Sequence, residues 1–212
     1  MEFIDEGIEE YARLHTEPEN DLLKELVRET HAMVLQPRML SGHLQGRFLS
    51  FIAKVYQPSL ILEIGTYTGY SSLCMALALP EVRITALDKN PEWTKIANKY
   101  WQDAGVSNRI ELTVGLALDT LKTFDDQSFD FIFIDADKRN YLNYFEESLR
   151  VVKANGVILI DNVLWNGRVI DATHDDPGTQ AIRKLNDLIS TDPRVEICMV
   201  PIGDGLTIVR KK

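Results

Sequence analysis

The segment FIFIDADKRNY, residues 131–141, contains the change of residue type that decides the predicted fold. Its first four residues are apolar or aromatic, which is typical of a strand buried on both faces, and charged residues follow within four positions. A second apolar run, VILI at residues 157–160, ends in the same way at Asp161 and Asn162. We therefore expect two strands of one sheet whose polar ends point at one shared object.

Length and composition predict a globular protein with a core of ordinary size. The chain has 212 residues, of which 45% are hydrophobic and 26% are charged, and this balance is typical of globular domains. We expect one domain over residues 1–212, with residues 1–56 as a helical cover and residues 57–212 as the sheet-containing core. No linker or repeat divides the sequence.

Several function classes are disfavoured by the same composition. No apolar run is long enough to span a membrane, and the acidic start is not typical of a signal peptide. Cys74 and Cys198 suggest no disulfide framework and suit a reducing compartment, so we expect a cytoplasmic protein. The formal net charge of -9 disfavours a nucleic-acid partner held mainly through its phosphates and does not exclude a local basic patch.

Strand-like and helix-period segments alternate along the chain. The strand-like runs are SLILEIG (59–65), VRITALD (82–88), RIELTVG (109–115), DFIFID (130–135) and GVILID (156–161). This alternation predicts an α/β fold with right-handed crossovers and a doubly wound, mostly parallel sheet, as in Rossmann-like proteins. Two further runs, residues 195–201 and 206–211, are joined only by IGDG, which predicts a C-terminal antiparallel hairpin.

Two predicted helices carry clear end signals. Asn90 is a natural N-cap for a helix that begins at Pro91, and Gly105 supplies a left-handed stop. An earlier helix in TEPENDLLKELVRETHAMVL is expected to begin with a capping box formed by Thr16 and Glu19.

The first two strand ends predict a nucleoside-containing cofactor. EIGTYTGYSS, residues 63–72, is a glycine turn into a helix, and it lacks the G-x-G-x-x-G spacing that brings a backbone against a pyrophosphate. S-adenosylmethionine has no pyrophosphate, and helix N-terminal amides can meet its carboxylate. Asp88, at the end of the second run, can accept hydrogen bonds from ribose hydroxyls. Taken singly, the glycines can be plain turn residues and Asp88 a helix cap.

The charged ends of the later strands predict a metal site. Asp135, Asp161 and Asn162 offer hard oxygen ligands with no nearby Cys or His, which suits Mg²⁺ or another divalent cation such as Mn²⁺ or Ca²⁺. Lys138 follows closely enough to reach the same place. Asp and Asn also start ordinary turns, and most lysines are solvated, so either feature alone favours the simpler interpretation.

Five segments together resemble the cation-dependent O-methyltransferases, a family that includes the catechol and caffeoyl-coenzyme A O-methyltransferases. They are RMLSGHLQGRFLSF (38–51), LEIGTYTGYSSLCMA (62–76), ALDKNPEW (86–93), FIDADKRNYLNYF (133–145) and LIDNVLWNGRV (159–169). The resemblance implies S-adenosylmethionine as cofactor, Asp135, Asp161 and Asn162 as metal ligands, and Lys138 as catalytic base. It implies cofactor contacts from Met39, Ser41, Glu63, Gly65, Ser71, Asp88, Gly115, Ala117 and Asp135. GLALDTL departs from the family pattern at Leu116, which weakens the assignment of the adenine contacts.

The expected reaction is methyl transfer to a metal-chelated hydroxyl. Two vicinal oxygens on a cation lose a proton more readily than a free phenol, and Lys138, if neutral, can take that proton. We expect a small aromatic diol of the catechol or hydroxycinnamoyl type, with Trp165 as an apolar wall or as plain packing. Alternatives are a hydroxylated tRNA base, for which Arg38, Arg47 and Lys54 would supply basic charge, and a nicotinamide-dependent oxidoreductase. The resemblance and the apolar N-terminal helices also predict a homodimer.

Overall fold

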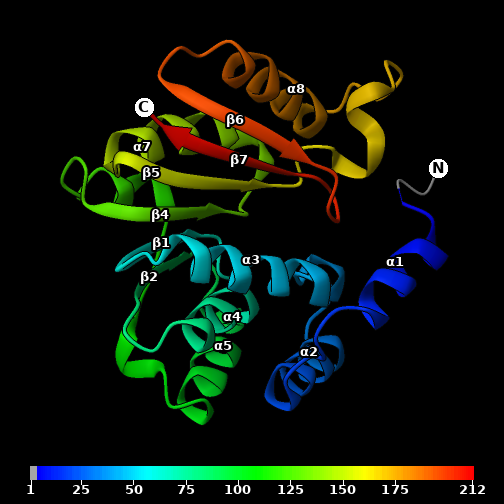
Figure 1. Cartoon of the computed structure of the whole chain (residues 1–212), viewed down its shortest axis with the longest axis vertical. Coiled ribbons are helices and arrows are strands. Elements are labelled where there is room, and N and C mark those ends of the chain that lie inside the picture. Colours follow the sequence, from blue (N-terminus) through cyan, green and yellow to red (C-terminus); the bar gives the residue numbers. More distant parts are fainter. Residues whose placement is uncertain (1–3) are drawn as a thin grey trace.

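The five apolar runs form the parallel part of a seven-stranded sheet in the computed structural model, which describes residues 4–212 (Figure 1). The strand order is β3-β2-β1-β4-β5-β7-β6. From the central strand β1, the chain adds β2 and β3 on one side and then β4 and β5 on the other. The strands are β1 (Leu60–Ile64), β2 (Arg83–Asp88), β3 (Ile110–Val114), β4 (Phe129–Ile134), β5 (Val152–Asp161), β6 (Val195–Val200) and β7 (Leu206–Lys211). The predicted doubly wound sheet is confirmed.

The C-terminal hairpin completes one edge of this sheet. β7 pairs antiparallel with both β5 and β6, so the last strand of the chain lies inside the sheet and β6 forms the edge. The turn between them is IGDG, residues 202–205, as the sequence predicted. Because β7 runs opposite to β5, this turn lies beside the carboxyl ends of the parallel strands.

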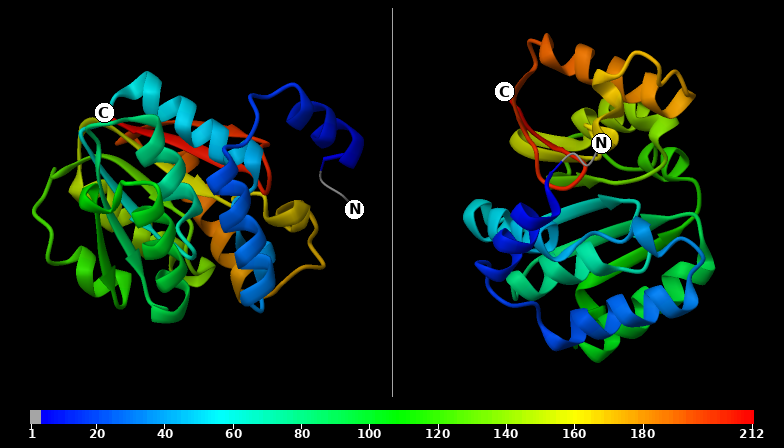
Figure 2. Two further views of the ribbon diagram at one scale, coloured as in Figure 1. Left: turned by 90° about the horizontal axis from the view of Figure 1, so that it is seen from below. Right: turned by 90° about the vertical axis from the view of Figure 1, so that its right-hand side faces the viewer.

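Helices cover both faces of the sheet, as the two views of Figure 2 show. The α-helices are α1 (Glu6–Leu14), α2 (Asp21–Met33), α3 (His43–Tyr56), α4 (Tyr70–Ala78), α5 (Pro91–Asp103), α6 (Ala117–Leu121), α7 (Tyr141–Val151) and α8 (Pro177–Ser190). Short 3₁₀ segments are η1 (Pro37–Met39), η2 (Ser107–Arg109), η3 (Lys138–Asn140) and η4 (Trp165–Ile170). None of the helices within residues 4–212 combines the length and apolar character needed to cross a bilayer.

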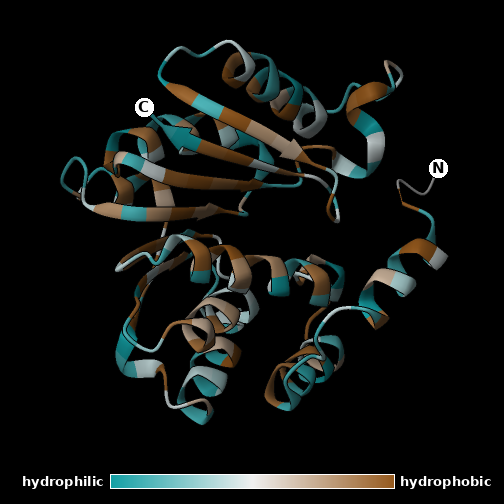
Figure 3. Ribbon diagram, in the orientation of Figure 1, coloured by the Kyte–Doolittle hydropathy of each residue, from teal (hydrophilic) through white to brown (hydrophobic). Residues whose placement is uncertain are grey.

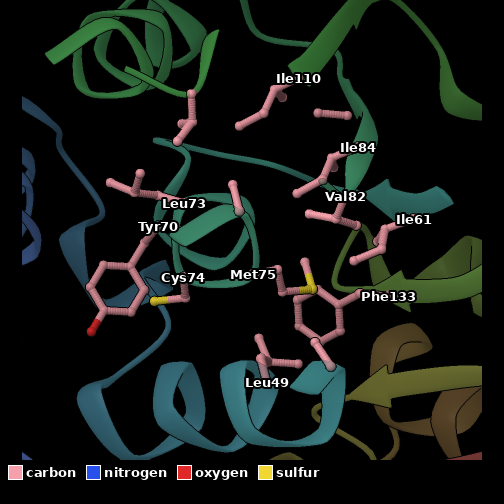
Figure 4. Close-up of a cluster of buried hydrophobic side chains, with 14 of the residues drawn as sticks. Leu49, Ile61, Tyr70, Leu73, Cys74, Met75, Val82, Ile84, Ile110 and Phe133 are labelled. Atoms are coloured by element: carbon pink, nitrogen blue, oxygen red, sulfur yellow. The ribbon is translucent and has the colours of Figure 1, made fainter. Parts of the chain in front are cut away.

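Alternate residues of the central strands enter two separate cores. In β4, Phe131 and Phe133 face the helices α3 and α4, whereas Ile132 and Ile134 face α7 and α8, and all four side chains are fully buried. Burial on both faces explains the continuous apolar run, which appears as brown strands in Figure 3. Figure 4 shows the first core, where Leu49 of α3, Met75 of α4 and Phe133 converge.

The N-terminal helices differ from the predicted cover in where they begin and what they touch. α2 begins after Asn20, whose side chain accepts a hydrogen bond from the Leu22 amide at 2.8 Å. The predicted capping box of Thr16 and Glu19 is therefore wrong. The Thr16 hydroxyl instead donates to the carbonyl oxygen of Ala12, at the end of the separate helix α1.

These helices also cover the sheet unequally. α3 packs on α4 and the sheet, α2 lies against α4 and α5, and α1 has no buried residue. The helix from Pro91 is confirmed in full, with Asn90 as its cap and Gly105 in the left-handed conformation after its end.

Candidate active site

A cleft of about 1870 Å³ lies along the carboxyl ends of the parallel strands. Pockets for one small ligand usually measure roughly 300–1,000 Å³, so this cleft has room for two molecules. Most of the predicted site residues line it: Met39, Ser41, Gly65, Asp88, Gly115, Ala117, Asp135, Lys138, Asp161, Asn162 and Trp165. Glu63 and Ser71 are not among the lining residues and lie buried behind the glycine turn.

The glycine turn after β1 is shaped by close contact with the end of β4. Gly65 has φ +93°, and a Cβ there would lie 1.9 Å from the carbonyl oxygen of Asp135. Only glycine fits this position, because both the backbone conformation and the space exclude a side chain. Gly69 has a different function, since its missing side chain lets α4 approach Ala97 of α5. The first glycine borders the cleft and the second serves helix packing.

Asp88 holds the next strand end in place while leaving capacity to bind a ligand. Its Oδ2 accepts a hydrogen bond from the Tyr67 amide at 2.7 Å, and its Oδ1 accepts one from the Asn90 amide at 2.8 Å. Burial raises the pKa of this carboxyl, and these backbone hydrogen bonds oppose that effect. Each carboxylate oxygen has a second lone pair, so Asp88 can still accept from hydroxyl groups in the cleft.

The end of β3 forms an open, apolar part of the cleft. A Cβ on Gly115 would meet no atom within 4 Å, so space remains above this backbone. Leu116 is 64% exposed although it is apolar, and it lines the cleft together with Tyr67 and Trp93, whose rings pack edge to face. An exposed apolar side chain beside aromatic rings is suited to a flat ring system.

The ends of β4 and β5 bring two carboxylates together. Asp161 is only 3% exposed. Its oxygens accept hydrogen bonds from Gln45 Nε2 and from the backbone N–H of Asn162, each at 2.7 Å. Burial, followed by the nearby Asp135 charge, raises the pKa of Asp161. Two such carboxylates are costly to bury as anions unless positive charge lies between them.

Lys138 supplies that positive charge in this structure. Its Nζ donates to Asp135 Oδ1 at 3.0 Å, to Tyr141 Oη at 2.6 Å and to Asn162 Oδ1. The side chains of Lys138 and Asp135 are 13% and 20% exposed, so this is a largely buried ion pair. The ammonium group marks a point where oxygen atoms from two strand ends converge on a cation.

This convergence is the observation by which the residues fit a divalent ion. Within residues 4–212 no group of three or more His, Cys, Asp and Glu side chains is arranged to hold a metal. Asp135 and Asp161 therefore need the Asn162 amide oxygen as a third ligand, and that oxygen already faces the ammonium group. The donor set is all oxygen, which suits Mg²⁺ and leaves positions for water or substrate oxygens.

Trp165 lies beside this cluster in the loop after β5. Its ring centroid is 5.6 Å from Lys138 Nζ, and its indole N–H is buried with no partner among the described residues. Arg183 of α8 holds the loop that follows. Its guanidinium donates hydrogen bonds to the carbonyl oxygens of Arg168, Val169, Asp171 and His174. The segment after β5 thus consists of η4 and a loop that Arg183 holds in place.

Three residues near the cluster were missed at the sequence level. Gln45 reaches Asp161 from α3, Tyr141 contacts Lys138, and Asp204 of the hairpin turn contacts Asn162. Tyr141 stands three positions after Lys138, and that spacing is a signal that could have found it. The other two contacts join residues 116 and 42 positions apart, so no local pattern predicts them.

The chain matches the family model described as O-methyltransferase over residues 13–212. It belongs to the O-methyltransferase family. A probable caffeoyl-CoA O-methyltransferase of Dictyostelium discoideum is 41% identical over 207 residues, covering 95% of this chain and 90% of the relative. The caffeoyl-CoA O-methyltransferase of Medicago sativa is 42% identical and covers 91% and 83% of the two chains.

Solved structures of other methyltransferases have the same fold as this O-methyltransferase. A Bacillus cereus O-methyltransferase in complex with SAH is 34% identical, with a TM-score of 0.89 and coverage of 97% of each chain. An SAH-bound methyltransferase of Podospora anserina is 31% identical, with the same TM-score and coverage of 97% and 94%. The predicted family and fold are confirmed. Nothing in the fold or the relatives supports the nicotinamide-dependent alternative.

The protonation of Glu63, behind the glycine turn, can be tested without a ligand through the pH dependence of the unfolding free energy. Its side chain is fully buried, it accepts hydrogen bonds from the hydroxyls of Thr66 and Ser71, and burial raises its pKa to about 8. The folded protein thus keeps a proton on Glu63 above the pH, about 4.3, at which an unfolded glutamate releases it. Between these values the unfolded state binds fewer protons, so stability falls as pH rises.

We expect Glu63→Gln to remove this dependence, because glutamine does not titrate. Relative to the parent, the variant should gain about 1–3 kcal/mol of unfolding free energy between pH 5 and pH 7.5. Urea denaturation of both proteins across this range measures the difference, and the other titrating groups cancel because both proteins contain them. Parallel stability curves would show that Glu63 is ionised in the folded protein.

Proposed function

We propose that this O-methyltransferase moves a methyl group from S-adenosylmethionine to a hydroxyl of a small vicinal diol, of the catechol or hydroxycinnamoyl type, held at a divalent cation. The observation that carries the proposal is the convergence of Asp135 and Asn162 oxygens on one ammonium group beside the buried Asp161 carboxylate, inside a cleft large enough for two molecules. The relatives named for caffeoyl-CoA support the substrate type.

The cofactor would occupy the part of the cleft between the ends of β1 and β3. Asp88 would accept from the ribose hydroxyls, and Leu116, Trp93 and the open space above Gly115 would receive the adenine ring. Met39, Ser41, Gly65 and Ala117 would line its remaining surface. Glu63 and Ser71 would act from behind the turn, by keeping its backbone amides in position, since neither borders the cleft.

The methyl acceptor would lie between the metal ligands and Trp165. A divalent cation bound by Asp135, Asp161 and Asn162 would make a coordinated hydroxyl more acidic. A bound divalent cation would take over the positive charge that the Lys138 ammonium supplies here, so Lys138 in its neutral form would be placed to take the released proton at Nζ. Tyr141 holds the lysine side chain toward the cluster. The Trp165 ring would form an apolar wall of the substrate site.

Methyl-transfer assays test this function directly. The protein should methylate simple catechols or a caffeoyl thioester with S-adenosylmethionine and Mg²⁺, and a chelator or Asp161→Ala should abolish the reaction. Asp125→Ala, which removes an exposed carboxylate outside the cleft, is the matched control and should keep full activity. Full activity in chelator would remove the cation from the proposal.

A hydroxylated RNA base is the alternative substrate. Methylation of hydroxylated RNA, with no methylation of the small diols, would make RNA the substrate in place of the diol. Arg47, one of the three residues expected to supply basic charge for RNA, is already paired with Glu17.

The base is tested by replacing Lys138. Lys138→Met keeps most of the apolar stem and removes the base, so kcat should fall roughly 10²- to 10⁴-fold, the usual contribution of general-base catalysis. Lys138→Arg should fail as well, because a guanidinium stays charged. The loss should be smaller for nitrocatechols, whose hydroxyls ionise more readily. Lys184→Met, an exposed lysine of α8, should leave kcat unchanged. If kcat of Lys138→Met lies within about threefold of the parent value, the proton leaves by a route that does not need Lys138.

We also propose that the protein is a homodimer that uses the N-terminal helices. Apolar side chains on α1 and α3 are exposed, with Tyr11 65% and Phe51 68% accessible. Covering such residues with a second copy would remove apolar surface from water. Light scattering should give twice the 24.1 kDa chain mass, and Phe51→Glu should shift the population toward monomer. A 24.1 kDa particle at micromolar concentration would contradict the proposal.

A further inference from the structure

The loop after β5 has an unusual backbone. Asn162, Trp165 and Asn166 have positive φ values of 57°, 47° and 54°, and Gly167 has 74°. Left-handed conformations are uncommon for residues other than glycine and persist where surrounding contacts impose them. The same loop carries a proposed metal ligand and the proposed substrate wall. Some other part of the chain must therefore hold it in this shape.

The hairpin turn between β6 and β7 provides the contacts that hold the loop. The carbonyl oxygen of Asp204 accepts hydrogen bonds from the Leu164 amide at 2.9 Å and the Trp165 amide at 3.2 Å, and the Gly205 carbonyl accepts one from Val163 at 3.1 Å. The turn and the loop are in close contact here, because a Cβ on Gly205 would lie 2.4 Å from Leu164 Cγ. Backbone contacts thus fix the path of the loop.

The Asp204 side chain adds control over one particular group. Its Oδ1 accepts from the Asn166 amide at 3.2 Å, and its Oδ2 accepts from Asn162 Nδ2 at 3.4 Å. A carboxylate only accepts hydrogen bonds, so the NH₂ end of the Asn162 amide must face Asp204. The oxygen end then faces the opposite way, toward Lys138 and the carboxylate cluster.

The hairpin turn does not need this carboxylate for its own closure. The turn is closed by backbone hydrogen bonds, from the Ile202 amide to the Val200 carbonyl at 3.0 Å and from the Gly205 amide to the Ile202 carbonyl at 2.9 Å. Both oxygens of the Asp204 side chain are directed to residues of the loop instead. An ordinary turn-forming aspartate would bond to its own turn.

We propose that Asp204 is a positioning residue that sets the orientation of the Asn162 amide, so that its oxygen, and not its NH₂ group, is presented to the cation. The inference rests on the proposed metal site. An amide side chain in the reverse orientation would place two hydrogens against the cation and remove one of three ligands. Partners that orient metal ligands typically change metal affinity 10- to 100-fold when they are lost.

A double-mutant cycle separates orientation from support of the fold. Asp204→Ala is measured in the parent and in an Asn162→Asp background, where the ligand has two equivalent oxygens and no orientation to set. Calorimetric titration with Mg²⁺ or Mn²⁺, without substrate, gives the affinity of each protein. Thermal unfolding of each metal-free protein reports the fold. Glu196→Gln, which removes a carboxylate from β6 of the same hairpin away from the loop, is the matched control.

We expect Asp204→Ala to weaken metal binding about 10- to 100-fold in the parent and by less than about threefold in the Asn162→Asp background. Asp204→Asn, which keeps the size and loses the acceptor-only character, should give an intermediate loss. Glu196→Gln should bind metal as the parent does. Repeating the titrations at higher salt screens the long-range attraction between Asp204 and the cation, and the loss should persist.

Two results would overturn the inference alone. Equal losses in both backgrounds would show that Asp204 only supports the loop, and an unchanged affinity in the parent would show that it does not act on the metal site. Either result leaves the proposed methyl transfer intact. A parent protein that binds no divalent cation would overturn the proposed metal site and this inference together.

Discussion

Two carboxylates at the ends of neighbouring parallel strands cannot both be buried as anions without a positive charge between them. β4 and β5 pair in parallel register, so Asp135, which follows β4, and Asp161, the last residue of β5, lie side by side. The surrounding side chains follow from that constraint. Lys138 brings the charge, Gln45 and the Asn162 amide satisfy the deeper carboxylate, and Tyr141 fixes the lysine. The same electrostatic demand that makes the site costly to bury makes it receptive to a cation.

The parts of the site that the sequence predicted are those that strand geometry brings together. Parallel strands with apolar interiors end at one edge, so Gly65, Asp88, Asp135 and Asp161 could be placed in one cleft from their positions after strand-like runs. Asp204 of the hairpin turn and Gln45 of α3 could not be placed in the cleft from the sequence. Their side chains reach the cluster through tertiary packing, and IGDG contained only the signal of a turn.

One error shows where local patterns are ambiguous. Thr16 and Asn20 are both acceptable N-caps, and the choice depended on α1, whose last turn takes the Thr16 hydroxyl and leaves Asn20 to begin α2. Glu63, near the end of β1, is buried and does not border the cleft, and its predicted contact with the cofactor stays a prediction.

The position of β7 inside the sheet makes the loop after β5 depend on the C-terminal hairpin. The proposed ligands, the cofactor turn and the lysine all precede residue 163, yet the turn that shapes the loop after β5 forms only when the last two strands have paired. The pairing that places this turn joins β5 to a strand far along the chain, and contacts between distant segments form more slowly than local ones. A chain that lost β6, β7 and the turn between them would keep every proposed ligand and lose the contacts that hold the loop after β5.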